Sequence, residues 1–422
     1  MKVLINSYTC CPGMGSEQGM GWNWITHLAR HCELYVITEG EYRPQIEAWM
    51  NDSVNSLLAE NLHFYWNPVT SEVRKMCWNQ GDWRFYKYYK EWQKKTADIA
   101  RGICKTESIQ ILHQLNMIGF REPGYLWQVS KETGIPFVWG PIGGLKQFPL
   151  AYTVGGGLKM KLFNSIKNFI NILQIKYDCR VDEAMKQASL LISSIPDSYK
   201  AIKKYKGLES VVIPETGCFL DNSPNSSRSS SPSSPLTVLW VGKFDFRKRL
   251  DIAIEAVAKA NRNIILKIYG TGDETQTEKA KLLVNKLGVS DMIQFMGNRP
   301  NNEVKDAMRK ADLFLFTSVS EDTSTVVLEA VSNLLPVLCF DACGMSAVID
   351  DTVGHKVPLT DPKQSINDFA TQLQYFYDNP SELQKRSQGC VARSSNLSWE
   401  KKVTDLMEVY ASLTPNLSLI DS

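Results

Sequence analysis

Short β-branched runs alternate with helical stretches on both sides of a serine- and proline-rich segment, and this alternation restricts the fold more than any other feature. The alternation is typical of βαβ units and a parallel sheet. The segment Asn222–Pro235 reads NSPNSSRSSSPSSP and is too polar to form a core, so it is expected to be a linker. A chain of 422 residues also exceeds the ~250–300 residues of one core. The sequence therefore predicts an α/β protein with two Rossmann-like domains, the first covering residues 1–221 and the linker 222–235.

The expected elements follow from hydrophobic periodicity. Before the linker, strands are expected at 3–7, 34–37, 109–113 and 137–139, and a helix at 19–30. After it, strands are expected at 237–241, 264–269, 293–296, 313–317 and 337–340, with helices at 252–260, 274–287, 302–310 and 325–333.

Two further helices are expected to be basic and amphipathic, at residues 83–103 and 159–175. Their apolar stripes are Phe85, Tyr89, Trp92, Ile99 and Ile103 in the first, and Phe163, Ile166, Phe169, Ile170 and Leu173 in the second. Such helices can lie on an anionic bilayer. The alternative for each is an ordinary helix packed on the core.

Composition excludes several classes of protein. The 47 basic and 45 acidic residues leave a net charge of +2, which offers no argument for a nucleic-acid partner. The ten cysteines have no framework spacing, as expected for thiols in a reducing compartment. No apolar run reaches the ~18 residues of a membrane span, and the N-terminus lacks a signal-peptide core. We therefore expect a soluble cytoplasmic protein, with attachment to the inner face of the cytoplasmic membrane as an option.

A glycine-rich loop follows the first expected strand. Its glycines Gly13, Gly15 and Gly19 let the backbone approach a ligand, and the following helix start offers free amides to a phosphate. The spacing is not the G-x-G-x-x-G of dinucleotide sites, and Ser16 is an alternative explanation as a plain helix cap. A nicotinamide or flavin oxidoreductase stays open at this point.

Two charged loops follow strands after the linker. Lys243, Arg247, Lys248 and Arg249 come directly after the strand at 237–241, at the sheet edge where doubly wound folds bind ligands. Each cation–phosphate contact there is worth on the order of 4 kcal/mol before desolvation. The alternative is a solvated run of charge.

The second loop begins at Ser320 and contains two acids in the pattern S-E-D-T-S-T-V-V-L-E. Glu321 is expected in the loop and Glu329 in the first turns of the next helix, with Ser324 as its cap. Acids on either side of a helix start can accept hydrogen bonds from sugar and ribose hydroxyls. The alternative is a capped helix with an exposed glutamate.

Together these two loops resemble the family 4 retaining glycosyltransferases (glycosyl transferases group 1), which have the GT-B fold. Lys243 and Lys248 match the Arg and Lys of the family pattern G-R-x(4)-K, and Glu321 and Glu329 match E-x(7)-E. Supporting matches are residues 13–21, His113, residues 137–144, 269–274, 295–297, 343–345 and 398–400. Two departures are Lys243, which lacks the bidentate fork of arginine, and Thr323–Thr325 in place of Gly-Phe-Gly.

The resemblance implies two Rossmann-like domains facing each other across a cleft, with the second at 236–396 and a helix at 397–414 that crosses back to the first. It implies that Lys243 and Lys248 stabilise a departing diphosphate, Glu329 binds ribose, Glu321 binds sugar hydroxyls, and His113 lies near the reacting face of the sugar. The other donor-binding residues it implies are Gly15, Gly242, Thr323, Ser324 and Thr325. For His113, a core histidine is the alternative.

The implied activity is transfer of a sugar from a nucleotide-diphosphate sugar to an acceptor hydroxyl with retention. The absence of D-x-D from the sequence agrees with an expected metal-independent site, and no cofactor is expected besides the donor. The expected acceptor is a lipid-linked glycan in capsule, O-antigen or exopolysaccharide synthesis, with peripheral contact to an anionic membrane. A noncatalytic nucleotide-sugar-binding partner and the oxidoreductase are the competing hypotheses.

Overall fold

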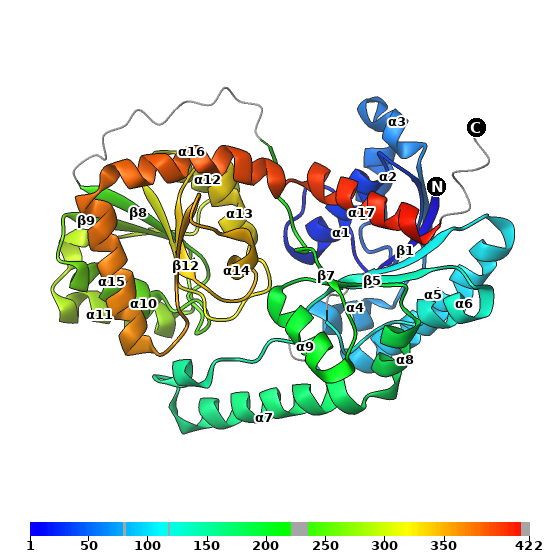
Figure 1. Cartoon of the computed structure of the whole chain (residues 1–422), viewed down its shortest axis with the longest axis horizontal. Helices are drawn as coiled ribbons and strands as arrows, with labels where there is room; N and C mark the ends of the chain where they lie inside the picture. Colours follow the sequence, from blue (N-terminus) through cyan, green and yellow to red (C-terminus); the bar gives the residue numbers. More distant parts are fainter. Residues whose placement is uncertain (79–81, 117–118, 221–234, 415–422) are drawn as a thin grey trace. The chain divides into compact units, whose positions relative to one another are not determined.

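The computed structural model describes residues 1–78, 82–116, 119–220 and 235–414. The chain divides into two compact units (Figure 1). The first comprises Met1–Lys146, Ile170–Glu215 and Trp399–Ser422, and the second comprises Gln147–Phe169 and Thr216–Ser398. Residues 147–169 thus group with the second unit, although the sequence placed all of 1–221 in the first domain. Residues 222–234 of the predicted linker lie outside the described residues.

The first unit is built on a seven-stranded parallel sheet of order β3-β2-β1-β4-β5-β6-β7. Strand β1 pairs with β2 on one side and β4 on the other, so that Val3 lies opposite both Leu34 and Ile111. The strands are β1 Lys2–Ser7, β2 Glu33–Thr38, β3 Leu62–Trp66, β4 Ile111–Asn116, β5 Phe137–Ile142, β6 Leu190–Ser193 and β7 Val211–Val212.

Helices connect these strands as parallel βαβ crossovers. They are α1 Ser16–Leu28, α2 Arg43–Met50, α3 Ser56–Ala59, α4 Ser71–Trp78, α5 Phe85–Thr106, α6 Leu126–Thr133, α8 Cys179–Gln187 and α9 Pro196–Lys206. The last helix, α17 Trp399–Leu413, also belongs to this unit but follows the strands of the second sheet. The long helix α7, Gly157–Tyr177, begins in the second unit and ends in the first.

The second unit has a six-stranded parallel sheet of order β10-β9-β8-β11-β12-β13. Its strands are β8 Leu236–Val241, β9 Ile264–Tyr269, β10 Ile293–Gly297, β11 Leu313–Phe316, β12 Val337–Phe340 and β13 Gly354–Val357. Its helices are α10 Leu250–Ala260, α11 Glu274–Leu287, α12 Asn301–Lys310, α13 Thr325–Ser332, α14 Met345–Val348, α15 Pro362–Asp378 and α16 Pro380–Asn396. In strand sequence this is the 3-2-1-4-5-6 order of doubly wound folds, which reverses between β8 and β11.

Both sheets are covered by helices on their two faces, which explains the nearly continuous apolar strands of the sequence. Alternate residues of one strand enter different cores: Val238 and Trp240 of β8 pack on one side of the sheet, and Leu239 on the other. In β1, Leu4 likewise packs on the face opposite Val3 and Ile5. The expected pair of parallel α/β sheets is confirmed.

All nine strands expected from the sequence occur, with ends shifted by a few residues, and α11 has the predicted bounds. Strands β3, β6, β7 and β13 were not predicted. Strand β7 has only two residues, and β13 reads GHKV, so neither carries an apolar run that could reveal it. The boundary of β4 differs most, since it begins at Ile111 rather than Ile109 and continues to Asn116.

The two basic amphipathic helices have different environments. In α5, the apolar side chains Phe85, Tyr89, Trp92 and Ile103 are buried, so this helix packs on the core. In α7, the apolar stripe is exposed. In the parts of the chain that the structure describes, no helix has both the length and the apolar character needed to cross a membrane.

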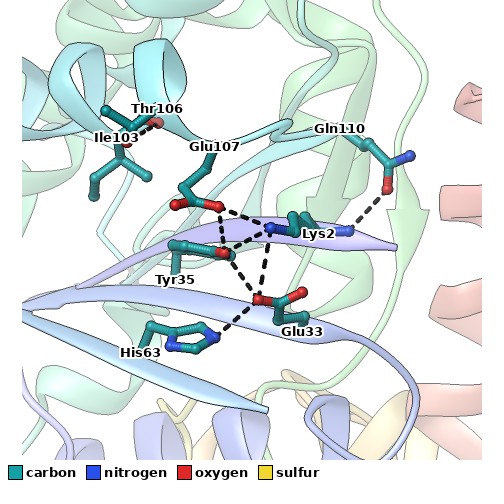
Figure 2. A network of polar contacts seen from close by, with 8 residues as sticks. All are labelled: Lys2, Glu33, Tyr35, His63, Ile103, Thr106, Glu107 and Gln110. Atoms are coloured by element: carbon teal, nitrogen blue, oxygen red, sulfur yellow. Dashed lines mark hydrogen bonds and ion pairs between the residues drawn. The ribbon is translucent and has the colours of Figure 1, made fainter.

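A polar network joins the amino ends of β1 and β2 to the end of α5 (Figure 2). The ammonium of Lys2 donates to Glu107 at 2.8 Å and to the hydroxyl of Tyr35 at 2.9 Å. The Tyr35 oxygen lies 2.7 Å from Glu107 and 2.8 Å from Glu33, which also contacts His63 at 2.9 Å. Because parallel folds bind ligands at the carboxyl ends of their strands, we interpret this network as structural.

Candidate active site

Lys248 and Glu321 form an ion pair at the carboxyl edge of the second sheet. Lys248 lies in the loop after β8 and Glu321 in the loop after β11, the two neighbouring strands between which the strand order reverses. The Lys248 Nζ atom is 2.9 Å from Oε1 of Glu321, and the two side chains are 14% and 18% exposed. The ammonium also lies 5.0 Å from the centre of the Phe316 ring, the last residue of β11. The pair thus occupies the usual ligand position of a doubly wound fold.

The backbone of the β8 loop is held by polar contacts that fix Lys248. The Asp245 carboxylate accepts from the backbone amides of Arg247 and Lys248 at 2.8 and 3.2 Å. The hydroxyl of Thr317 lies 2.9 Å from the Lys248 carbonyl and accepts from Trp240 Nε1 at 3.1 Å. The Ser318 hydroxyl donates to Glu321 at 3.0 Å, so both members of the ion pair are oriented from the end of β11.

The four cations of this loop have different roles in the structure. Lys243 and Arg247 are exposed, and Lys248 is partly buried against Glu321. Arg249 is buried: its guanidinium pairs with Asp251 at 2.6 Å and donates to the Tyr152 carbonyl at 3.1 Å. Arg249 therefore anchors the segment around Tyr152, and of the two lysines predicted to contact a diphosphate, Lys248 is the one already paired with an acid.

The loop after β11 leads into α13 as expected. Ser324 occupies the N-cap position, although its side chain makes no capping hydrogen bond, and Thr323 and Ser324 are buried. The Glu321 amide donates to Cys343 Sγ at 3.4 Å, and the Gly344 amide donates to the Asp322 carbonyl at 3.2 Å. A side chain at Gly344 would overlap Thr323, so glycine is required for this close approach.

Glu329 lines a cavity of about 300 Å³ that runs along one side of α13, from Thr325 to Asn333. Its carboxylate accepts from Asn301 Nδ2 at 3.2 Å. Lys305 and Arg309 reach the cavity from α12 with the i, i+4 spacing of one helix face. The lining residues are Gly217, Cys218, Phe219, Leu220, Lys305, Arg309, Thr325, Glu329, Ser332 and Asn333. The cavity combines cations, an acid and apolar surface, which suits a nucleoside with an attached phosphate.

Gly242 and Gly270 bring the ends of β8 and β9 into contact behind the ion pair. The Gly242 amide donates to the Tyr269 carbonyl at 3.0 Å. Gly270 has a φ of +130°, and a Cβ atom there would overlap the Gly242 carbonyl. The predicted donor-binding residue Gly242 thus lies next to Lys248, whose Cδ a Cβ at position 242 would approach to 3.7 Å.

In the first unit, the glycine loop precedes α1 as predicted. The N-cap of α1 is Gly15, and Ser16 is already its first residue, with a φ of +56°. The expectation that Ser16 could cap the helix is therefore wrong, because the cap position belongs to Gly15. A Cβ at Gly19 would overlap the Met14 carbonyl, so glycine lets the loop fold over the first turn.

His113 is a core residue in the structure, so its predicted contact with a sugar is corrected. The ring has no exposed surface, and burial lowers its pKa to about 4. Its Nε2 lies 2.8 Å from the Gly140 carbonyl, which can only accept, so Nε2 carries the proton. Nδ1 therefore accepts from the Tyr410 hydroxyl of α17 at 2.5 Å. Both nitrogens are occupied within the protein.

Several residues in or beside the Glu329 cavity were not predicted from the sequence. Asn301, Lys305 and Arg309 of α12 come from an amphipathic surface helix, and only the i, i+4 spacing of the two cations hinted at a common face. Among the described residues, no group of three or more His, Cys, Asp or Glu side chains is arranged to hold a metal ion.

Comparisons with known proteins show what the second unit resembles. Residues 222–389 match the family model described as glycosyl transferases group 1. A D-inositol 3-phosphate glycosyltransferase of Streptomyces bingchenggensis is 26% identical over 195 residues, 44% of this chain and 42% of the relative. The lipopolysaccharide glucosyltransferase WaaG of Escherichia coli is 35% identical over 118 residues, 27% of this chain and 30% of the relative. The matches span less than half the length of these two relatives.

A likeness in structure extends over nearly the whole chain. The crystal structure of Alr3699/HepE from Anabaena in complex with UDP superposes with a TM-score of 0.64 and 14% identity, covering 98% of this chain and 100% of that one. At this identity the likeness concerns the fold, and it includes both parallel sheets.

Proposed function

We propose that the protein transfers a sugar from a nucleotide-diphosphate sugar to an acceptor hydroxyl, since the chain has the GT-B fold and its residues 222–389 match the glycosyl transferases group 1 model. The observation that carries this proposal is the meeting of Lys248 and Glu321 at the point where the strand order reverses, beside the start of α13. UDP, which the Anabaena protein binds, is the first nucleotide to test.

In the proposed reaction, Lys248 stabilises the negative charge that develops on the departing diphosphate. An ammonium has three N–H donors, so Lys248 can keep its contact with Glu321 and still donate to a phosphate oxygen. Lys243 is exposed in the same loop and supplies a second cation. Free amides at the start of α13 add positive potential. Such preorganised donors are worth ~100-fold or more each in rate.

The cavity beside Glu329 is the proposed nucleoside site. The Glu329 carboxylate accepts hydrogen bonds from the ribose hydroxyls, and Glu321 accepts hydrogen bonds from hydroxyls of the transferred sugar. The acceptor oxygen bonds to the anomeric carbon as the bond from that carbon to the phosphate breaks, and the acceptor proton passes to the departing phosphate. The same proposal includes retention of configuration at the anomeric carbon, a reaction that needs no metal ion, and contact of Gly15 with the donor.

The proposed acceptor is a lipid-linked glycan used in surface polysaccharide synthesis, taken from an anionic membrane surface by a cytoplasmic enzyme. The apolar stripe of α7 supports this part, since it leaves apolar and basic side chains exposed together.

The test measures thermal unfolding with UDP-, GDP- and ADP-sugars, because a bound donor stabilises the fold in proportion to ligand concentration over Kd. The stabilising donor is then incubated with the protein, and release of the free nucleotide diphosphate is measured with and without added acceptor. Stabilisation by one donor class and release of its diphosphate are the expected results.

Other outcomes decide between the competing hypotheses. Flavin or nicotinamide absorbance in the purified protein, without donor binding, would favour an oxidoreductase. Donor binding without turnover under any acceptor would favour a noncatalytic nucleotide-sugar-binding protein. The anomeric configuration of the product, read by NMR, tests retention separately.

A further inference from the structure

Helix α7 presents asparagine side chains to the protein and a stripe of apolar side chains to solvent. Asn168 is buried and binds the backbone of Phe148 twice, donating to the carbonyl at 2.9 Å and accepting from the amide at 2.9 Å. One turn later Asn171 is buried and accepts from Arg121, which also donates to Gln174 at 2.6 Å. The covered side of the helix is therefore held by amide groups, with Ile175 as the buried apolar side chain near its end.

The opposite face of α7 is apolar and exposed. Its members have exposed fractions between 39% and 65%, and they are Leu162, Phe163, Ile166, Phe169, Ile170 and Leu173. At about 100° per residue, this stripe lies roughly 180° from the stripe of Asn168 and Asn171. Monomeric soluble proteins rarely leave a continuous apolar stripe of this kind uncovered.

The charge around this stripe has one sign. Residues 133–177 contain five lysines and no aspartate or glutamate, although the whole chain has 45 acidic residues in 422. Lys159, Lys161, Lys167 and Lys176 lie on α7 itself. A helix of this composition repels a second copy of itself and attracts an anionic surface.

We propose that α7 is the membrane-docking element of this protein and lies in the interface of an anionic bilayer, with its apolar stripe among the acyl chains and its lysines at the headgroups. This deepens the proposed function, since it names the surface that would bring the protein to a lipid-linked acceptor. Docking itself needs no donor and no turnover, so it can be measured independently.

The experiment is flotation of the full chain with phosphatidylcholine vesicles that contain or lack phosphatidylglycerol, at low and high salt. The wild type is expected to float with the anionic vesicles and to be released by salt. Phe163→Ser with Phe169→Ser is expected to lower the partition coefficient tenfold or more, since roughly 0.8 kcal/mol is lost for each buried methylene. Lys159→Gln with Lys161→Gln is expected to lower it by about fivefold per lysine on anionic vesicles only.

Leu57→Ser and Leu282→Ser are the matched controls, because they remove apolar side chains of similar exposure elsewhere on the surface. Thermal unfolding verifies that each variant is folded. The proposal is overturned if the wild type does not float, or if the α7 variants float as well as the controls. It is also overturned if sedimentation shows a dimer that only the α7 variants dissolve, because the stripe would then join two copies.

Release of nucleotide diphosphate, measured on the same wild-type sample without vesicles, separates the two proposals. Flotation without release refutes the proposed activity and leaves docking in place. Release without flotation refutes docking by α7 and leaves the activity.

Discussion

Lys248 Nζ and Glu321 Oε1 lie 2.9 Å apart, although the residues belong to loops after different strands of the second sheet. Lys248→Ala is expected to lower the transfer rate by ~100-fold or more, because it removes a cation from the departing diphosphate. Steady-state kinetics with the donor identified by thermal shift is the measurement. Lys281→Ala, which removes an exposed lysine from α11, is the control and should retain the wild-type rate. Equal rates in both variants would refute the role of Lys248.

Glu329→Ala is expected to weaken donor binding more than it slows chemistry. The residue lines the cavity of about 300 Å³, whose lining does not include Lys248 or Glu321, and its carboxylate would contact ribose in both ground and transition states. Loss of one hydrogen bond to a charged group costs about 1.5–3 kcal/mol, or roughly tenfold or more in Kd. Calorimetric titration with the donor measures this, and Glu278→Ala on the exposed face of α11 is the comparison. An unchanged Kd contradicts the assignment.

The buried His113 predicts a loss of stability in acid. Its folded pKa of about 4 lies below the ordinary value of 6.5, so the fold favours the neutral ring and the unfolded chain takes up the proton first. The stability supplied by His113 is complete above about pH 6.5 and falls as the pH drops toward 4, by roughly 3 kcal/mol in all. Denaturant unfolding at several pH values tests this.

Two variants isolate that effect. In His113→Phe, the difference in stability from the wild type should shrink as the pH falls from 6.5 to 4, because the variant has no ring to protonate. Tyr410→Phe removes the donor to Nδ1 and is expected to cost about 1–3 kcal/mol at neutral pH while keeping the pH dependence. A constant difference between the wild type and His113→Phe across this pH range would contradict the burial argument.

The Lys2 network predicts a smaller, salt-sensitive effect. Hydrogen bonds from Lys2 and Tyr35 lower the pKa of Glu107, so the stability they supply is present above the ordinary glutamate value and is lost as the pH falls through the lowered pKa. Because the network is open to solvent, Lys2→Met should lower the melting temperature less than Tyr410→Phe does, and added salt should reduce the difference. Scanning calorimetry at two salt concentrations is the measurement.

Gly344→Ala is expected to impair donor binding by displacing the loop at Asp322 and Thr323, which a Cβ atom would overlap. Gly102→Ala is the matched control: position 102 lies within α5, no neighbouring atom lies within 4 Å of a Cβ there, and alanine should stabilise the helix by about 0.5–1 kcal/mol. Donor-induced thermal shifts should fall in the first variant and persist in the second. Equal shifts would show that the loop tolerates the change.

The architecture was accessible from the sequence because strands buried on both faces leave continuous apolar runs, and the amphipathic helices between them leave a 3.6-residue period. The resemblance to group 1 glycosyltransferases of GT-B fold is confirmed by the match of residues 222–389 and by the likeness in structure. It could be seen in the sequence because Lys243, Lys248, Glu321 and Glu329 follow apolar strands at fixed spacing. A two-residue strand such as β7 carries no comparable signal.

The tertiary structure decided what each of these side chains does. Three adjacent cations, Arg247 to Arg249, look alike in the sequence, yet Arg249 is buried against Asp251 while Lys248 faces Glu321, because the backbone of one loop turns them to different sides. The burial of His113 and the choice of which face of α7 is covered were likewise decided by tertiary packing. Periodicity shows that a helix has two faces, but only the packed neighbours decide which face is covered, and for α7 the covered face is the one that carries Asn168 and Asn171.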